Sequence, residues 1–283
     1  MQFRLERYLD ASRRLDTTGI NWDAAGEVPL QRGERAFLQY ATEVEDHTIV
    51  YLRELLATTA VEDPDVTAFL SCWVYEEHFH GRALERFLQA VDGDETPHRD
   101  LPGRLRREGR LRRAAKAVVM PVLSRALPDF PAVHMTWGAV NELTTLTGYQ
   151  RCIERTDNPV LAELLARIIR DERRHYAFYY QQAKRRLARS PTMQRWTRRL
   201  MDRAWSPVGT GVYDLATIRI ASDHLFDNPD GRRALAAAQD QIAKLPGMEG
   251  WTGLTDKVLG GARPAPAASR RLEPVHLGGE PVR

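Results

Sequence analysis

The sequence predicts an all-α protein with a four-helix bundle and additional helices on its periphery. Apolar residues recur at spacings of three and four along most of the chain, and no segment shows the alternating pattern of a strand. Asp63-Pro64 and Asn158-Pro159 each place a capping side chain before a proline, which is typical of a helix start. Two helical pairs are separated by a long connection.

The long helices of this prediction cover residues 34–57, 64–91, 131–155 and 159–188. Short connections join the first helix to the second and the third to the fourth, so each pair is expected to form an antiparallel hairpin. The crossover between the pairs should carry one or two shorter helices with a break near Pro121, because proline removes a helical hydrogen bond. Two hairpins joined by a long crossover have the connectivity of a ferritin-like bundle.

Three later segments, at residues 192–205, 213–226 and 230–245, predict further helices packed around the bundle. We therefore interpret residues 1–259 as one helical domain. Residues 260–283 are rich in Pro, Gly, Ala and Arg and contain few large apolar side chains, which is typical of a disordered tail.

Composition narrows the class of protein. Hydrophobic residues make up 43% of the chain and charged residues 28%, which is ordinary for a soluble globular protein. No apolar run approaches the roughly 20 residues of a membrane span, and the charged N-terminal stretch does not resemble a secretory signal, so we expect a cytoplasmic protein with no membrane span. Cys72 and Cys152 lack the spacing of a disulfide framework or a zinc site and are expected to be buried thiols.

Residues 104–116, RLRREGRLRRAAK, form a dense cationic block. Such a block is either a solvated helix face or a landing surface for an acidic partner. The block has no interleaved aromatic residues and no nucleic-acid-binding module accompanies it, so we expect no nucleic-acid partner.

Two of the long helices place a Glu-x-x-His motif on their apolar stripe. The residues are Glu77 and His80 in the second helix and Glu172 and His175 in the fourth. Residues three apart lie one above the other on a helix, so both side chains of each motif should point into the core. A buried carboxylate needs a proton, an ion pair or a metal ion to offset its desolvation.

The other two long helices each add one glutamate, Glu45 and Glu142, in the middle of the apolar stripe. Glu45 precedes Glu77 by 32 residues and Glu142 precedes Glu172 by 30, so hairpins of similar length would bring all four carboxylates to one level. Four glutamates and two histidines from four helices are the ligands of a carboxylate-bridged di-iron or di-manganese centre. A metal-free network of buried charged residues is the alternative.

Residues beside these ligands are assigned by their direction around the helix. Glu76 lies about 100° from Glu77, so we expect it at the surface or as a hydrogen-bonding neighbour of the ligands. Glu45 is preferred to Glu43 because the apolar stripe passes through it. His47 and His78 lie off their stripes and are expected to be solvated.

Two further residues leave alternatives open. Asp171 either accepts a hydrogen bond from a ligand histidine or is an exposed helical aspartate. Thr145 lies one turn beyond Glu142 and either faces the metals or belongs to the core.

Together these motifs resemble those of the soluble acyl-acyl carrier protein desaturases, a ferritin-like di-iron family. WVYEEHFHG at residues 73–81 follows the family pattern W-x-x-E-E-x-x-H-G, and DERRH at residues 171–175 follows D-E-x-x-H. Glu45 and Tyr51 keep the family's spacing from the first ligand to a tyrosine, and ELTT keeps its E-x-x-T pattern. The resemblance covers about residues 34–187.

The resemblance implies that the four glutamates and two histidines are the metal ligands. It further implies that Thr145 is an active-site threonine assisting oxygen activation and proton delivery, and that Asp171 and Trp73 support the ligands of the bound cofactor. A homodimer, a ferredoxin-type electron donor and an acyl substrate on acyl carrier protein are also implied, with the block at 104–116 as the carrier's landing site.

The expected function is therefore an oxygen-dependent di-iron oxidase that desaturates a carrier-bound acyl chain, with manganese as the other candidate metal. Asp46 and Ile49 replace a Glu and a Pro of the family pattern, and His78-Phe79 replaces Asn-Arg. These departures keep a hydroxylase or N-oxygenase of specialised metabolism as the alternative. A ferroxidase or iron-binding protein and a metal-free helical interaction protein are the remaining classes.

Overall fold

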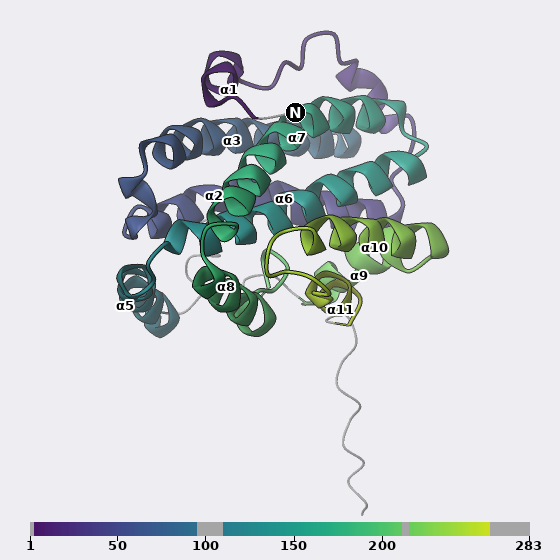
Figure 1. Cartoon of the computed structure of the whole chain (residues 1–283). Coiled ribbons are helices and arrows are strands. Elements are labelled where there is room, and N and C mark those ends of the chain that lie inside the picture. The colour runs from purple at the N-terminus through teal and green to yellow at the C-terminus, as the bar shows by residue number, and fades with distance from the viewer. Residues whose placement is uncertain (1–2, 95–109, 211–214, 261–283) are drawn as a thin grey trace, which may run out of the picture.

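The computed structural model describes residues 3–94, 110–210 and 215–260, and within these ranges the chain is helical and contains no strand (Figure 1). The predicted all-α class is confirmed. The side chains of the cationic block at residues 104–116 lie outside the described part of the chain, as does the predicted tail from residue 261 onward. None of the described helices is both long enough and apolar enough to cross a bilayer.

Four long helices form the bundle: α2 (Arg32–Leu55), α3 (Pro64–Asp92), α6 (Phe130–Arg155) and α7 (Pro159–Leu187). They pack as two antiparallel hairpins, α2 with α3 and α6 with α7. An ion pair of 2.7 Å between Arg35 and Asp92 joins the start of α2 to the end of α3. At the end of α7, Arg186 pairs with Asp129 before α6 at 2.7 Å and also with Asp63 before α3, which ties the two hairpins together.

The predicted helix starts are confirmed by their caps. The Asp63 carboxylate accepts hydrogen bonds from two backbone N–H groups in the first turn of α3, at 3.0 and 3.2 Å. The Asn158 side chain does the same for α7, at 3.1 Å each, and its amide donates to the carbonyls of Ala25 and Val28. These caps satisfy backbone donors that a helix start leaves unpaired.

The predicted break at Pro121 is wrong. The helix α5 (Arg110–Ala126) continues through this proline as one element. Proline removes a single backbone donor, and the remaining hydrogen bonds of the helix keep it continuous. The Pro121 carbonyl accepts a hydrogen bond from the Ser124 hydroxyl at 2.8 Å.

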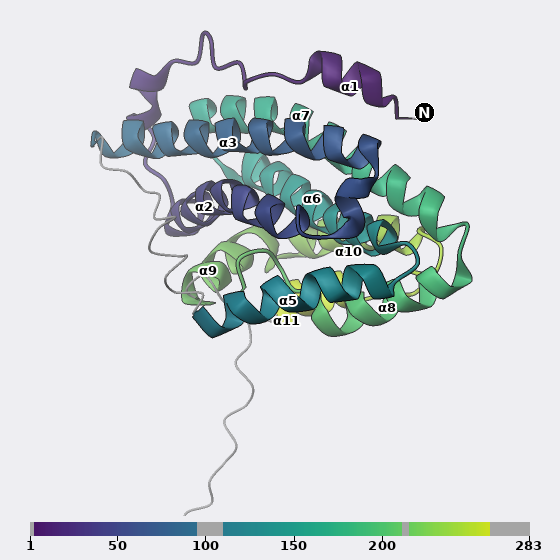
Figure 2. The same cartoon turned by 90° about the vertical axis from the view of Figure 1, so that its left-hand side faces the viewer.

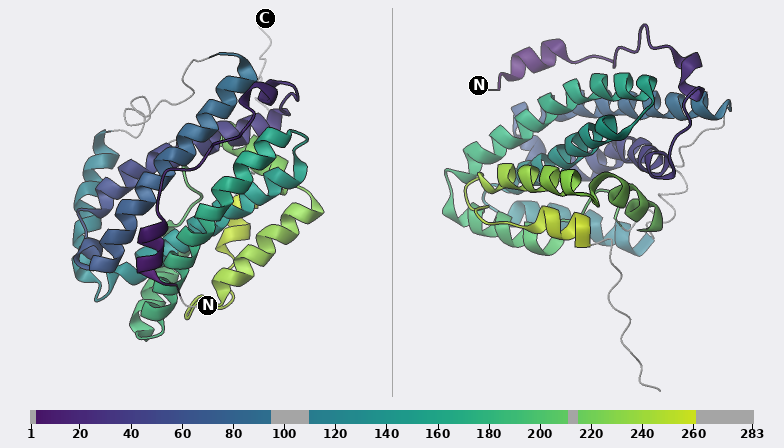
Figure 3. Two further views of the ribbon diagram at one scale, coloured as in Figure 1. Left: turned by 90° about the horizontal axis from the view of Figure 1, so that it is seen from above. Right: turned by 90° about the vertical axis from the view of Figure 1, so that its right-hand side faces the viewer.

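Two layers cover opposite sides of the bundle (Figures 2 and 3). The N-terminal segment, with α1 (Leu5–Ala11) and the short helix η1 (Trp22–Gly26), crosses the α3/α7 side. The α2/α6 side is covered by α5 and by the C-terminal helices, which are α8 (Pro191–Ala204), α9 (Leu215–Phe226), α10 (Pro229–Ala243) and α11 (Gly253–Gly260). The three predicted peripheral helices correspond to α8, α9 and α10. The sequence did not predict α1 and α11, since each is too short to show a clear helical period.

Candidate metal centre

The structure brings the six predicted ligands together at the middle of the bundle. All six are buried, and none is more than 6% exposed. Their ligand atoms form two groups in which all atoms lie within 4.8 Å of one another. The first group is Glu45, Glu77, His80 and Glu172, and the second is Glu77, Glu142, Glu172 and His175.

Glu77 and Glu172 belong to both groups, and each uses its two oxygens to face both imidazoles. Glu77 lies 3.0 Å from His175 Nδ1 through one oxygen and 3.6 Å from His80 Nδ1 through the other. Glu172 lies 3.1 Å from His80 Nδ1 and 3.5 Å from His175 Nδ1 in the same way. If each group held a metal ion, Glu77 and Glu172 would be common to both sites, and Glu45 and Glu142 would each belong to one.

The unsatisfied atoms of this cluster test whether a metal pair fits. His80 Nδ1, His175 Nδ1 and both Glu172 oxygens are buried, and none has a hydrogen bond within the described residues. Each lies 3.0–3.8 Å from an oppositely charged group of the same cluster, yet none makes a well-formed hydrogen bond, and such a concentration of poorly satisfied buried polar atoms favours a bound cation. Hard carboxylate oxygens with one imidazole per group suit iron or manganese. The residues present could therefore hold a metal ion in each group.

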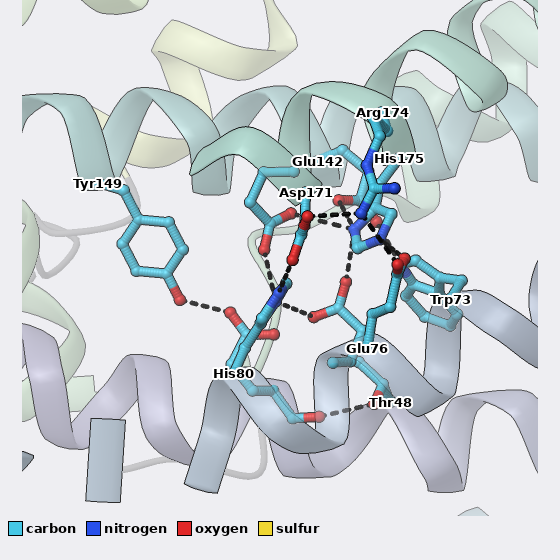
Figure 4. A network of polar contacts seen from close by, with 12 residues as sticks. Thr48, Trp73, Glu76, His80, Glu142, Tyr149, Asp171, Arg174 and His175 are labelled. Atoms are coloured by element: carbon cyan, nitrogen blue, oxygen red, sulfur yellow. Dashed lines mark hydrogen bonds and ion pairs between the residues drawn. The ribbon is translucent and has the colours of Figure 1, made fainter. Parts of the chain in front are cut away.

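The second nitrogen of each imidazole is held by a carboxylate from the opposite helix (Figure 4). His80 Nε2 on α3 lies 3.3 Å from Asp171 on α7, and His175 Nε2 on α7 lies 2.8 Å from Glu76 on α3. A carboxylate accepts the Nε2 proton and leaves Nδ1 free to bind a metal. Asp171 thus makes the contact considered for it from sequence.

Glu76 is completely buried, so its predicted alternative place at the surface is wrong. The direction about 100° round the helix from Glu77 points towards α7 and the N-terminal segment instead of solvent. The Tyr8 hydroxyl donates to Glu76 at 2.8 Å, and Arg174 donates to its other oxygen at 2.9 Å. Arg174 also pairs with Asp171, so one guanidinium links the carboxylates that orient both histidines.

Two aromatic side chains hold the glutamates that belong to one group each. Trp73 Nε1 donates to Glu142 at 2.9 Å, which agrees with the supporting role implied for this tryptophan. The Tyr149 hydroxyl donates to Glu45. Sequence reasoning missed Tyr8 and the role of Tyr149. Tyr149 carried a signal, since it lies on the same apolar stripe as Glu142, whereas nothing in the short segment around Tyr8 indicated a contact with α3.

The protonation of the metal-free cluster follows from burial and crowding. Burial alone would lower the pKa values of His80 and His175, but the surrounding carboxylates hold both well above the ordinary value. Burial, reinforced by neighbouring carboxylates, raises the pKa values of Glu45 and Glu142 well above normal. For Glu77, contacts with Glu45 and both imidazoles outweigh burial and hold the pKa well below normal. A metal ion must therefore displace protons to bind.

The remaining sequence predictions near the centre have mixed outcomes. His78 is exposed as predicted, and Glu43 is only half-buried whereas Glu45 is buried. His47 is half-buried and lines a cavity, so its predicted solvation is wrong, because layers that the sequence could not place cover this side of α2. Both cysteines are free thiols, and Cys152 is buried whereas Cys72 is half-buried.

Two cavities of about 400 Å³ each adjoin the cluster on the α2/α6 side. The α9 cavity is lined by residues of α2, α6 and α9, including Phe37, Gly148 and Leu225. The α5 cavity is lined by residues of α2, α5, α6 and α8 and by four of the ligand carboxylates. The cavities share the wall residues Val44, Glu45, Asn141 and Thr145 together with Ser206, Pro207, Val208 and Thr210.

Thr145 is therefore placed where the two cavities meet beside the cluster. The hydroxyls of Thr144 and Thr147 donate to backbone carbonyls one turn earlier, at 2.7 and 2.6 Å. No hydrogen bond of the Thr145 hydroxyl occurs within the described residues, so this group is available to a molecule in the cavities. Thr145 is thus half-buried in the cavity wall, and its facing of bound metals stays a prediction.

The fold and the site define a helical bundle whose buried carboxylates and imidazoles could hold metal ions. Comparison of the chain with models of protein families, with curated proteins and with solved structures found no match. The functional interpretation rests on the geometry of the site and on the spacing of its motifs.

Proposed function

We propose that this chain is an oxygen-dependent di-iron oxidase that desaturates an acyl chain carried on acyl carrier protein. The observation that carries the proposal is the α5 cavity, in which four ligand carboxylates face a space with mainly apolar walls. The apolar wall residues include Leu55, Met120, Leu123, Phe130, Val133 and Leu200. An apolar cavity beside a redox-capable ligand set suits a hydrocarbon substrate and an oxidation reaction.

The two cavities give an extended chain room on both sides of the reacting carbon. Their shared wall contains Glu45 and Thr145, so a chain passing from one cavity to the other would place a middle segment beside the cluster. The apolar walls would exclude water from that segment and fix which carbon faces the centre.

Two iron ions bound here would supply the transfer of electrons to dioxygen that oxidation of an unactivated C–H bond requires. In the overall balance, dioxygen accepts two hydrogen atoms from adjacent carbons, two electrons from a ferredoxin-type donor and two protons. The products are an alkene and two water molecules. In this proposal the Thr145 hydroxyl passes a proton at the cavity wall, and the hydrogen bonds of Trp73 and Tyr149 keep Glu142 and Glu45 in position.

The resemblance to the carrier-protein desaturases is the source of the other parts of the proposal. These are the acyl carrier protein, the ferredoxin-type donor, the homodimer, the cytoplasmic location and docking at residues 104–116. A hydroxylase or N-oxygenase acting at the same site is the alternative, and it differs in the mass of the product.

The test is mass spectrometry of acyl carrier proteins bearing saturated chains of about 10 to 20 carbons after incubation with the iron-loaded protein, oxygen and a ferredoxin reducing system. Desaturation predicts a loss of about two mass units on a preferred chain length, whereas hydroxylation predicts a gain of about sixteen. Glu172→Ala, which removes a ligand common to both metal groups, is the matched inactive control. No change on any chain, with iron bound, would contradict the proposal.

A further inference from the structure

The α5 cavity has a polar stretch of wall that the metal cluster does not explain. Tyr51 on α2, His134 on α6 and Tyr179 on α7 all line this cavity, and none belongs to the two groups of metal ligands. His134 is only 4% exposed and Tyr179 is completely buried. Their rings are 5.9 Å apart and nearly perpendicular, so the two side chains occupy the same part of the wall.

Tyr51 and His134 form a neutral pair. The Tyr51 hydroxyl lies 2.8 Å from His134 Nδ1. Burial lowers the pKa of His134 to about 3 and raises the pKa of Tyr51 above its ordinary value, so both groups are uncharged at neutral pH. When the phenol donates to Nδ1, the single proton of the neutral imidazole is on Nε2.

With that proton on Nε2, two donors on this wall have no partner. His134 Nε2 and the Tyr179 hydroxyl are buried without a hydrogen bond within the described residues. A saturated hydrocarbon chain cannot accept a hydrogen bond from either group. Leucine and phenylalanine would fill the same positions without leaving polar atoms unsatisfied, so the residue types indicate an occupant with an oxygen acceptor.

The charge of the wall restricts this acceptor. The cavity lining contains no lysine or arginine among the described residues, and four carboxylates of the centre face the same space. Metal ions bound to those carboxylates would offset their charge, but beside His134 and Tyr179 a carboxylate or phosphate of the occupant would be buried without a lysine or arginine to pair with. A neutral carbonyl, whose oxygen has two lone pairs, matches two neutral donors.

We propose that His134 and Tyr179 form a hydrogen-bonding subsite for a carbonyl oxygen of the substrate, with Tyr51 positioning the imidazole. The inference rests on the proposed function in that the occupant of the α5 cavity is taken to be the substrate of the metal centre. The carbonyl is either the thioester that links an acyl chain to its carrier or a keto group within the chain. Either one would fix the register of the chain against the metal ligands.

The test measures binding of three probes of equal length to the full-length, metal-loaded protein under anaerobic conditions, where no turnover occurs. The probes are ethyl decyl sulfide, the corresponding S-ethyl decanethioate, and the sulfide with a ketone in the middle of its decyl chain. Binding is followed by the change in tryptophan fluorescence, to which Trp73 and Trp137 of the cavity wall contribute.

We expect one carbonyl probe to bind about tenfold more tightly than the sulfide, and its identity distinguishes the thioester from the in-chain ketone. His134→Leu and Tyr179→Phe should each lower the ratio of carbonyl-probe affinity to sulfide affinity by about threefold or more. Neither change should alter the affinity for the sulfide itself. His134→Gln should retain part of the advantage. Leu200→Met, an apolar change elsewhere in the cavity, is the control and should affect all three probes alike.

Equal affinities of the three probes, or no binding of any of them, would overturn the subsite. An advantage that survives both His134→Leu and Tyr179→Phe would overturn it as well. These binding measurements use a different readout from the test of the proposed function, whose own failure is read from metal content and product mass. A protein that binds iron and desaturates a plain chain without preferring a carbonyl would refute only the subsite.

Discussion

The two sides of the metal-ligand cluster differ in almost every property. On the α3/α7 side, Glu76, Asp171 and Arg174 form a closed network beneath the N-terminal segment, and Tyr8 completes it. On the α2/α6 side, the same cluster opens to two cavities with largely apolar walls. Under the proposed function, rigid support on one side would allow the other side to admit a substrate without loosening the metal ligands.

This difference follows from what each helix contributes. α3 and α7 each supply a histidine, a shared glutamate and the carboxylate that orients the other helix's histidine. α2 and α6 each supply one glutamate that belongs to a single group and much of the cavity wall. The crossed pairing means that separation of α3 from α7 would release both histidines at once, so this side should tolerate the least movement.

The largest effect should come from the shared ligands. Glu172→Ala removes a ligand from both groups and should abolish binding of both ions, whereas Glu142→Ala removes a ligand from one group and should leave the other group complete. Metal analysis of protein purified from iron-supplied cells measures this difference. His78→Ala, a change at an exposed residue of α3, is the control. Two ions retained by the Glu172 variant would refute the shared role.

Substitutions on the closed side should come next. Glu76→Gln and Asp171→Asn keep the shape of each side chain but weaken the acceptor of an imidazole proton, and such changes reduce metal affinity about 10- to 100-fold. Anaerobic Mn²⁺ or Fe²⁺ titration provides the measurement. On the cavity side, Thr145→Val should leave this affinity unchanged and lower the oxidation rate. If Thr145→Val lowered metal affinity as much as Glu76→Gln or Asp171→Asn, the two sides of the cluster would not differ in their support of the metal ligands.

Metal affinity should also depend on pH. The raised pKa values of His80, His175, Glu45 and Glu142 mean that these groups hold their protons to higher pH in the metal-free protein than the free side chains do. A bound ion needs them deprotonated, so affinity should fall as pH falls, by about tenfold per pH unit for each proton displaced. Titration with Mn²⁺ between about pH 6 and 8, with proton release followed by calorimetry, tests the sign. A flat profile would show that the cluster is already deprotonated.

The smallest effect should come from Tyr8→Phe. This change removes one donor to Glu76 and leaves Arg174 and His175 Nε2 as side-chain donors to the same carboxylate. We expect the free energy of unfolding to fall by about 1 kcal/mol and metal affinity to fall severalfold. Urea unfolding and metal titration of the same preparation separate the two quantities. A normal metal affinity in this variant would limit the N-terminal segment to a packing role.

Helical periodicity and capping determined the bundle from the sequence. The stripes through Glu45, Glu77, Glu142 and Glu172 had a single arrangement that buried the apolar residues around them, and Asp63 and Asn158 marked the helix starts by local chemistry. The six side chains that meet at the centre were therefore predictable. Each depends on which face of its own helix it occupies.

Only the tertiary structure decided which side chains from different elements meet. The burial of Glu76, its bonds to Tyr8 and His175, and the cavities around Thr145 all depend on segments far apart in the chain. A helical period fixes directions within one helix, but it carries no information about the segment that packs on the far side. That contact is determined by how the bundle and its two covering layers pack together.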